Sequence, residues 1–295
     1  MKEVRRLRYA IIGGDTRAVC LARLLLEEGH RVHSYALEKA VLPGQISKED
    51  SLQAAVYGAD CVVLPVPAER SGLLNAPLSE ESRPLTEILE ALWPGQPVFG
   101  GGFGEESLRA ARQGELRLTD LLRRAEFTVG NAALTAEGAL GLLIRESDRA
   151  IWGGRVLVCG WGRIGRLLSL DLDALGAEVT VAARDPRDRA MARALGLRAL
   201  DYPELGDGIG DFEFLVNTVP ARVLSDAALC CVAPEALLLE LASPPGGFNR
   251  ELAKNIGLRA LIAPGLPGQY SPLAAARLMR REIEAALEEG KEMLL

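Results

Sequence analysis

The stretch Arg155–Gly165, which reads RVLVCGWGRIG, decides the fold of this 295-residue chain. Its first five residues are mostly apolar, as in a buried strand, and Gly160, Gly162 and Gly165 follow. The amphipathic pattern of residues 163–175 then predicts a helix. Strand, glycine turn and helix in this order are typical of a dinucleotide-binding unit. The glycines permit a tight turn, close approach of a pyrophosphate and close packing of helix on strand, and the helix start attracts phosphate.

The end of the second strand of this unit bears on the choice of nicotinamide cofactor. An NAD-binding unit has Asp or Glu there to hold the ribose 2′-hydroxyl. This chain reads VAARDP over residues 181–186, which places Ala183 at the acidic position and Arg184 directly after it. Because a guanidinium binds a 2′-phosphate and stacks on adenine, the sequence favours NADP over NAD. The alternative is that Arg184 is solvated and Asp185 holds the ribose.

Three later strands, predicted at residues 213–217, 236–241 and 258–262, end in small or polar residues. Open parallel sheets bind ligands at the carboxyl ends of their strands, so these loops are expected to surround a nicotinamide. Each loop alone could be a simple turn. The residues expected to bind the cofactor are Gly160, Gly162, Arg163, Ile164, Gly165, Arg184, Asn217, Thr218, Val219, Pro220, Ala242 and Gly265.

The first half of the chain repeats the alternation of short apolar runs and amphipathic stretches. Strands are expected at 8–12, 31–36, 61–65 and 98–99, and helices at 16–28 and 85–93. The predicted fold class is therefore α/β, with two doubly wound parallel-sheet domains, the second a Rossmann NAD(P)-binding domain. The expected segments are a substrate domain (1–130), a linking helix (131–149), the Rossmann domain (150–268) and a C-terminal segment (269–295) that packs back on the first domain.

Composition excludes several classes of function. With 34 Lys and Arg against 40 Asp and Glu, the net charge of −6 gives no basic surface for nucleic acid. The basic start is interrupted at Gly13–Gly14 before a signal-peptide core forms, and no run approaches the roughly 20 apolar residues of a membrane span. The five cysteines, none in a CxxC pair, are expected to be reduced core residues of a cytoplasmic protein.

The sequence also carries little acid–base or metal chemistry of its own. Both histidines, His30 and His33, lie beside the predicted second strand, and neither occupies the late position of a dehydrogenase acid–base histidine. We find no metal-ligand spacing and no acyl-transfer motif. If the chain is an enzyme, the cofactor carries the chemistry and the protein orients the reactants.

Several blocks, in this order, resemble the family of the dipicolinate synthase A chain. They are Ile12–Asp15 with Arg17, Asn131 with Thr135–Gly138, Gly160–Gly165, Asn217–Pro220, Pro245–Gly247 and Ala263–Gly268, and the resemblance runs from about residue 9 to 280. The sequence departs from the family at Leu134, where Pro is common, and at Pro244, where Arg precedes the PGG block. Gln269–Ser271 also replaces small and basic residues. The change at Pro244 removes an arginine that could grip a substrate carboxylate.

The resemblance implies an NADP-linked oxidation of dihydrodipicolinate to dipicolinate (pyridine-2,6-dicarboxylate) during sporulation, in the mother cell of a spore former. It also implies a partner, the second and flavoprotein-like subunit of dipicolinate synthase, and it leaves a homo-oligomer open. Two alternatives remain. One is another two-domain NAD(P) dehydrogenase, and the other is a non-catalytic, cofactor-binding scaffold for the flavoprotein subunit.

The dianionic substrate that the resemblance implies needs cationic or N–H partners. Arg17, after the Gly13–Gly14 turn, is the first candidate, and Arg70 is a weaker one. In a simpler interpretation, Asp15 only caps the first helix. Asn131, Thr135 and Glu137 are expected near the start of a helix over residues 135–146, where they contact substrate or cap the helix.

Overall fold

The computed structural model describes residues 6–292, so the extreme ends of the predicted first and last segments lie outside the described residues. The chain divides into two compact units. Unit 1 comprises residues 1–131 and 271–295, and unit 2 comprises residues 132–270. The first division falls inside the long helix α5 (Ala125–Glu146), and the second follows α10 (Leu266–Tyr270).

Unit 1 is built on a six-stranded parallel sheet with the strand order β3-β2-β1-β4-β7-β8. The strands are β1 (Arg8–Ile12), β2 (Arg31–Tyr35), β3 (Ser47–Lys48), β4 (Cys61–Val63), β7 (Pro97–Gly100) and β8 (Arg117–Asp120). A small antiparallel hairpin of β5 (Glu69–Arg70) and β6 (Leu73–Leu74) lies outside this sheet. The order doubles back at β1, as in a Rossmann unit, so the loops after β1 and β4 meet at the carboxyl edge.

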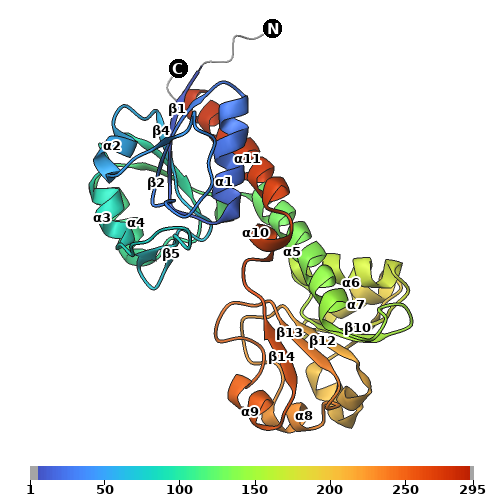
Figure 1. Ribbon diagram of the computed structural model, residues 1–295. Coiled ribbons are helices and arrows are strands. Elements are labelled where there is room, and N and C mark those ends of the chain that lie inside the picture. The colour runs from blue at the N-terminus through green and yellow to red at the C-terminus, as the bar shows by residue number, and fades with distance from the viewer. Residues whose placement is uncertain (1–5, 293–295) are drawn as a thin grey trace. The chain divides into compact units, whose positions relative to one another are not determined.

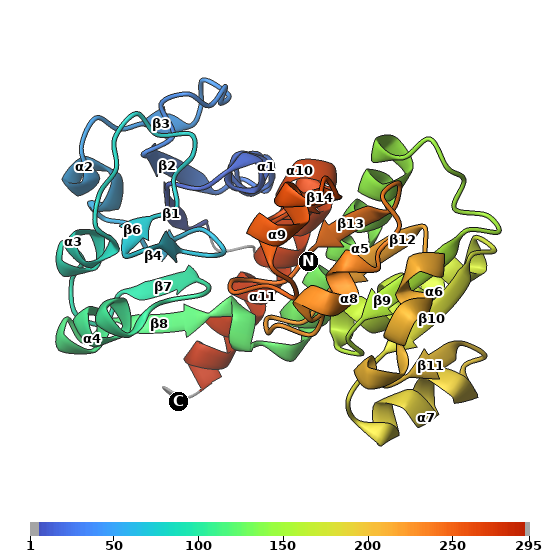
Figure 2. The ribbon, with the colours of Figure 1, turned by 90° about the horizontal axis from the view of Figure 1, so that it is seen from below.

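Helices cover both faces of this sheet (Figure 2). On one face α1 (Thr16–Glu27) and α11 (Pro272–Glu292) lie side by side over Tyr9 and Ile11. The other face, with Ala10 and Ile12, packs on α2 (Leu52–Val56), α3 (Leu85–Glu90) and α4 (Glu105–Gln113). The two-residue alternation along β1 therefore feeds two separate apolar clusters.

The terminal helix α11 is fixed to unit 1 by charge as well as by apolar contact. Arg124 Nε donates to Glu282 Oε2 at 2.8 Å, and its terminal nitrogens donate to Glu289 at 2.8 and 3.0 Å. Glu282 is almost fully buried. A buried carboxylate requires such a partner, because its desolvation is otherwise uncompensated.

Unit 2 holds the second parallel sheet, with the order β11-β10-β9-β12-β13-β14. Its strands are β9 (Arg155–Cys159), β10 (Glu178–Ala182), β11 (Arg198–Leu200), β12 (Phe214–Asn217), β13 (Leu237–Glu240) and β14 (Arg259–Ile262). In the register Cys159 lies opposite both Ala182 and Asn217, and Asn217 lies opposite Glu240. The loops that follow these strands are therefore neighbours at one edge.

Two layers of helices enclose the sheet of unit 2 (Figure 1). One layer contains the second half of α5, α6 (Arg163–Ala174) and α7 (Pro186–Ala194). The other contains the short helices η2 (Tyr202–Glu204), η3 (Gly206–Asp211), α8 (Asp226–Cys230) and α9 (Arg250–Asn255). Two parallel sheets, each with helices on both faces, confirm the predicted fold class.

Helix α5 differs from the sequence-based expectation in two ways. It begins at Ala125 rather than at residue 135, because Phe127 is buried and Gly130 lies against Leu278 of α11, so packing supports weak helix formers. Among residues 6–292 it is also the one helix long and apolar enough to cross a membrane, whereas no such segment was expected. This criterion is weak, since the core helix of a soluble protein meets it too.

The cysteines correct another expectation. Cys61 and Cys159 are buried and Cys20 is half-buried, but Cys230 and Cys231 are exposed. They lie at the end of α8, where Leu229 alone of that helix reaches the core. The apolar run that contains this pair therefore belongs to a surface helix. All five thiols are free.

Candidate functional site

The glycine loop after β9 shows a separate reason for each glycine. Gly160 has a φ of +102°, and a side chain there would meet the Thr218 hydroxyl at 2.5 Å. At Gly165 a methyl group would overlap the carbonyl oxygen of Gly160, so α6 packs directly on the end of β9. At Gly162, by contrast, a methyl group would meet no heavy atom within 4 Å. The loop thus combines two tight contacts with one open position.

That open position lies at the start of α6. Gly162 is the N-cap residue, no side chain caps the helix, and its first turn holds no acidic residue. Arg163 is exposed and Ile164 is half-buried. An uncapped helix start beside a cation favours an anion. The chain therefore offers backbone N–H groups and a positive charge where the sequence predicts a pyrophosphate.

Substitutions at two of these glycines should have different effects on stability. Gly165→Ala is expected to lower the free energy of unfolding by about 1–3 kcal/mol, because α6 must move away from β9. Gly162→Ala is the control, and it should cost only a few tenths of a kcal/mol at this N-cap. Denaturant unfolding of both variants measures the difference. Equal losses would contradict the packing role of Gly165.

The residues after β10 also separate by environment. Ala183 is buried and Arg184 is exposed. Asp185 caps α7 and accepts a hydrogen bond from the backbone N–H of Arg187 at 2.8 Å. The carboxylate that would hold a ribose in the alternative interpretation is therefore engaged in capping, whereas the Arg184 guanidinium faces solvent.

Arg189 braces this turn, a role that the sequence pattern did not indicate. One of its terminal nitrogens donates to the carbonyl oxygens of Ala183 and Arg184 at 2.7 and 2.6 Å. It also pairs with Asp201 at 3.1 Å. Its position one helical turn into α7 is the signal that could have indicated contact with the preceding loop.

The loops after β12 and β13 are tied to the strand ends. Thr218 Oγ1 donates to the carbonyl oxygen of Cys159 at 2.8 Å, which joins the loop after β12 to β9. Asn217 is buried, Val219 and Ala242 are half-buried, and Pro220 is exposed. Gly265 is exposed with a φ of +71°, but the expected turn after it is the short helix α10. The structure thus brings the predicted loops of unit 2 to one edge, and it adds buried Glu240 at the end of β13.

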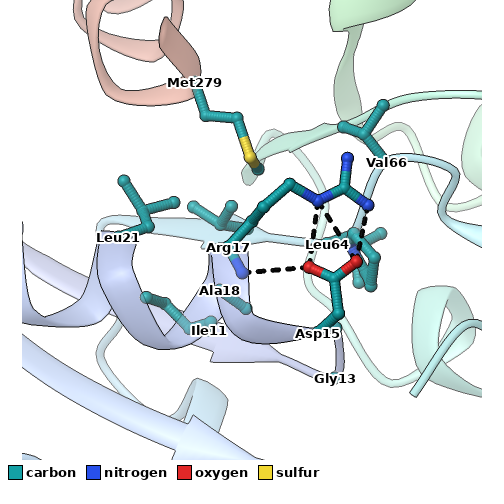
Figure 3. A pocket seen from close by; sticks show the side chains of 12 residues that line it. Ile11, Gly13, Asp15, Arg17, Ala18, Leu21, Leu64, Val66 and Met279 are labelled. Atoms are coloured by element: carbon teal, nitrogen blue, oxygen red, sulfur yellow. Dashed lines mark hydrogen bonds and ion pairs between the residues drawn. The ribbon is translucent and has the colours of Figure 1, made fainter. Parts of the chain in front are cut away.

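In unit 1, Arg17 and Asp15 form an ion pair at the start of α1 (Figure 3). Asp15 caps the helix through the backbone N–H of Arg17 at 3.0 Å. Arg17 Nε and Nη2 donate to the same carboxylate at 2.9 and 2.8 Å, while Nη1 points away from it. Burial opposes ionisation of Asp15, but the hydrogen bonds and charge of Arg17 outweigh it and hold the pKa of Asp15 below its usual value.

This ion pair lines a small pocket at the carboxyl ends of β1 and β4. The pocket walls are otherwise apolar and include Leu64, Val66 and Met279. Asp15 therefore serves as a cap and also orients a buried guanidinium, whose free edge faces this pocket. Arg70, the weaker candidate, is exposed on β5 outside the pocket.

The remaining substrate candidates lie inside α5 and not at its start, because the helix begins at Ala125. Asn131 is half-buried, Thr135 is buried and Glu137 is exposed. The expectation that they cap a helix is wrong. Their contact with substrate stays a prediction.

The histidines and the buried cysteine of unit 2 have structural environments. Nδ1 of His30 accepts from the backbone N–H of Leu7 at 3.1 Å, and burial lowers the pKa of His30. His33 pairs with Glu49 at 2.6 Å. Burial, followed by the charge of Glu240, raises the pKa of the Cys159 thiol to about 12, which makes it a poor nucleophile. Among the described residues, no group of three His, Cys, Asp or Glu is placed to hold a metal ion.

Two doubly wound units, one with an open glycine loop at its sheet edge, define the two-unit class to which many dehydrogenases belong. The sequence is 31% identical over 294 residues to the dipicolinate synthase A chain of Bacillus subtilis (strain 168), covering 97% of this chain and 99% of that protein. It therefore belongs to the dipicolinate synthase A chain family, which confirms the resemblance. Residues 8–122 also match the family model of the dipicolinate synthase A chain N-terminal domain.

Solved structures agree with this assignment. The dipicolinate synthase A chain of Bacillus subtilis superposes with a TM-score of 0.83 at 29% identity, covering 98% of each chain. The dipicolinate synthase A chain of Bacillus halodurans gives 0.81 at 27% identity, covering 96% of this chain and 97% of that one. A transhydrogenase from Sinorhizobium meliloti, with 0.68 at 16% identity over 96% and 95% of the two chains, shares the fold alone.

Proposed function

We propose that this chain is the NADP-dependent oxidoreductase subunit of a dipicolinate synthase, which oxidises dihydrodipicolinate to dipicolinate. The observation that carries the proposal is the identity of 31% with a dipicolinate synthase A chain over almost the whole of both proteins. The open, uncapped glycine loop of unit 2 supports the dinucleotide part of the proposal, because Gly162 leaves room for a phosphate group.

NADP is proposed rather than NAD. Buried Ala183 offers no carboxylate to the ribose, and Asp185 is engaged as the cap of α7. Exposed Arg184 is then the nearest charged group for a 2′-phosphate. The residues proposed to hold the cofactor are Gly160, Gly162, Arg163, Ile164, Gly165, Arg184, Asn217, Thr218, Val219, Pro220, Ala242 and Gly265.

The bound cofactor supplies a hydride acceptor, so that dihydrodipicolinate and NADP⁺ yield dipicolinate, NADPH and a proton. Loss of hydride and proton makes the substrate ring aromatic, so a strong general base is not required and orientation suffices. This fits histidines and a Cys159 thiol with structural environments. Arg17 is proposed to bind one substrate carboxylate through its free Nη1 edge, and Asp15 holds that guanidinium in place. Asn131, Thr135 and Glu137 are proposed as further substrate contacts.

A partner protein is part of the proposal, because the relative's name marks it as one component of a larger synthase. We propose the second, flavoprotein-like subunit of dipicolinate synthase as the partner and the cytoplasm of a sporulating mother cell as the location. The structural roles of the histidines favour one alternative, a non-catalytic, cofactor-binding scaffold for that flavoprotein subunit.

Calorimetric titration tests the proposal. The chain alone is expected to bind NADPH and, in its presence, dipicolinate. Binding of NADPH without dipicolinate would support the scaffold. A chain that binds neither nicotinamide cofactor would overturn the proposal.

A further inference from the structure

Glu240 is a buried carboxylate that joins the loops at the carboxyl edge of unit 2. It is the last residue of β13 and is 1% exposed. Its Oε1 accepts from the side-chain amide of Asn217 at 2.6 Å and from the backbone N–H of Ala242 at 3.0 Å. Its Oε2 accepts from the backbone N–H of Gly247 at 2.7 Å. One side chain therefore holds the ends of β12 and β13 and the loop beyond them.

The network continues from Asn217 into the next loop. The Asn217 amide nitrogen also donates to the carbonyl oxygen of Val219 at 2.9 Å, and its oxygen accepts from the N–H of Val219 at 3.2 Å. Space around the cluster is tight, since a methyl group on Gly247 would overlap the Asn217 side chain. Glu240 thus fixes the backbone of residues 217–219 through a rigid, filled contact.

A carboxylate suits this place better than a neutral amide. The three groups that hydrogen-bond to Glu240 are all donors, and a carboxylate offers only acceptors. A glutamine would present an NH₂ group to at least one of those donors and leave it unsatisfied, which is costly in a buried site. The ion also accepts stronger hydrogen bonds than a neutral group does.

We propose that Glu240 is a positioning residue for the nicotinamide end of the cofactor site. It does not touch the cofactor, but it sets the shape of the loops at Asn217–Pro220 and Ala242. The inference rests on the proposed function, because these are the loops proposed to surround the nicotinamide. It predicts that loss of Glu240 affects the nicotinamide half of the ligand and spares the adenine half, which meets the glycine loop and Arg184.

The test compares two ligands of Glu240→Gln, NADPH and 2′,5′-ADP, which lacks the nicotinamide half. The affinity for NADPH and the kcat of the reaction are each expected to fall by roughly tenfold or more, and the affinity for 2′,5′-ADP is expected to stay within about twofold. Glu240→Asp, which keeps the charge, should restore part of the loss. Unchanged NADPH binding and kcat, or an equal loss for both ligands, would overturn the inference.

Glu213→Gln is the matched control. Glu213 lies at the opposite edge of the same sheet, where it pairs with Arg149 at 2.7 Å and accepts from the Arg155 N–H at 3.0 Å. This variant should lose stability without any change in the NADPH to 2′,5′-ADP affinity ratio, and a matching change in that ratio would overturn the inference. If Glu240→Gln fails to fold, Gly247→Ala displaces Asn217 independently and should change the ratio in the same direction, while an unchanged ratio would overturn the inference. A wild-type chain that binds 2′,5′-ADP and NADPH equally well overturns the inference alone, and one that binds no nicotinamide cofactor overturns the proposed function with it.

Discussion

Replacing Arg184 with alanine is expected to lower the affinity for NADPH by roughly ten- to a hundredfold and to leave the affinity for NADH within about twofold. Hydrogen bonds from a guanidinium to a phosphate are among the strongest in proteins, and NADH lacks the 2′-phosphate. Arg184 is exposed at the carboxyl end of β10, and the neighbouring Asp185 is engaged in capping. Fluorescence titration with both cofactors measures the two affinities.

Arg198→Ala is the control for this experiment. Arg198 is also an exposed arginine of unit 2, but it begins β11 and so lies at the amino edge of the sheet. Its loss should change neither affinity. If Arg184→Ala retained the wild-type preference for NADPH, another group would have to bind the 2′-phosphate, and the NADP assignment would lose its main support.

Replacing Arg17 with alanine is expected to raise the KM for dihydrodipicolinate by roughly a hundredfold, with the affinity for NADPH unchanged. The substitution removes a buried, charged donor, whose hydrogen bonds are worth more than those of neutral groups. It also leaves the Asp15 carboxylate without its partner, so that a negative charge faces a dianionic substrate. Steady-state kinetics at saturating NADP gives the KM.

Two further variants make this prediction specific. Arg23→Ala removes an exposed arginine from the same helix, whose guanidinium donates to the carbonyl oxygen of Val41, and it should not change the KM. Arg17→Lys keeps the charge and should recover part of the loss. A KM within about twofold of wild type for Arg17→Ala would remove Arg17 from the substrate site.

The Arg17–Asp15 pair also has a consequence for stability at low pH. Because the pKa of Asp15 is lower in the folded chain than in the unfolded chain, its ionisation contributes stability above the ordinary aspartate pKa. That contribution is lost as the pH falls through the lowered pKa. In chemical denaturation followed across this pH range, Arg17→Ala should therefore show a smaller loss of stability on acidification than the wild type.

The sequence predicted the parts of the fold that depend on local pattern. The strand, glycine turn and helix at Arg155–Gly165 follow from neighbouring residues, and so do the alternating faces of β1. Packing between distant segments decides the parts that were missed. The first turns of α5 contain weak helix formers and are held by contacts such as Gly130 against Leu278.

The candidate site divides in the same way. Glycine and strand-end residues were visible because their spacing along the chain carries the signal. Glu240 was missed, because the sequence shows a charged residue at the end of LLLE but not that donors from two other loops surround it. A carboxylate that closes an apolar strand at the carboxyl edge of a parallel sheet is the signal that could have indicated it.

The most direct test of the proposed function is a single reaction. The purified chain is incubated with NADP and freshly generated dihydrodipicolinate, first alone and then with the flavoprotein subunit, and both dipicolinate and NADPH are quantified. We expect the chain alone to form both products in equal amounts. No dipicolinate in either mixture, or dipicolinate formed by the flavoprotein subunit with no NADPH, would contradict the proposal that this chain carries the oxidation.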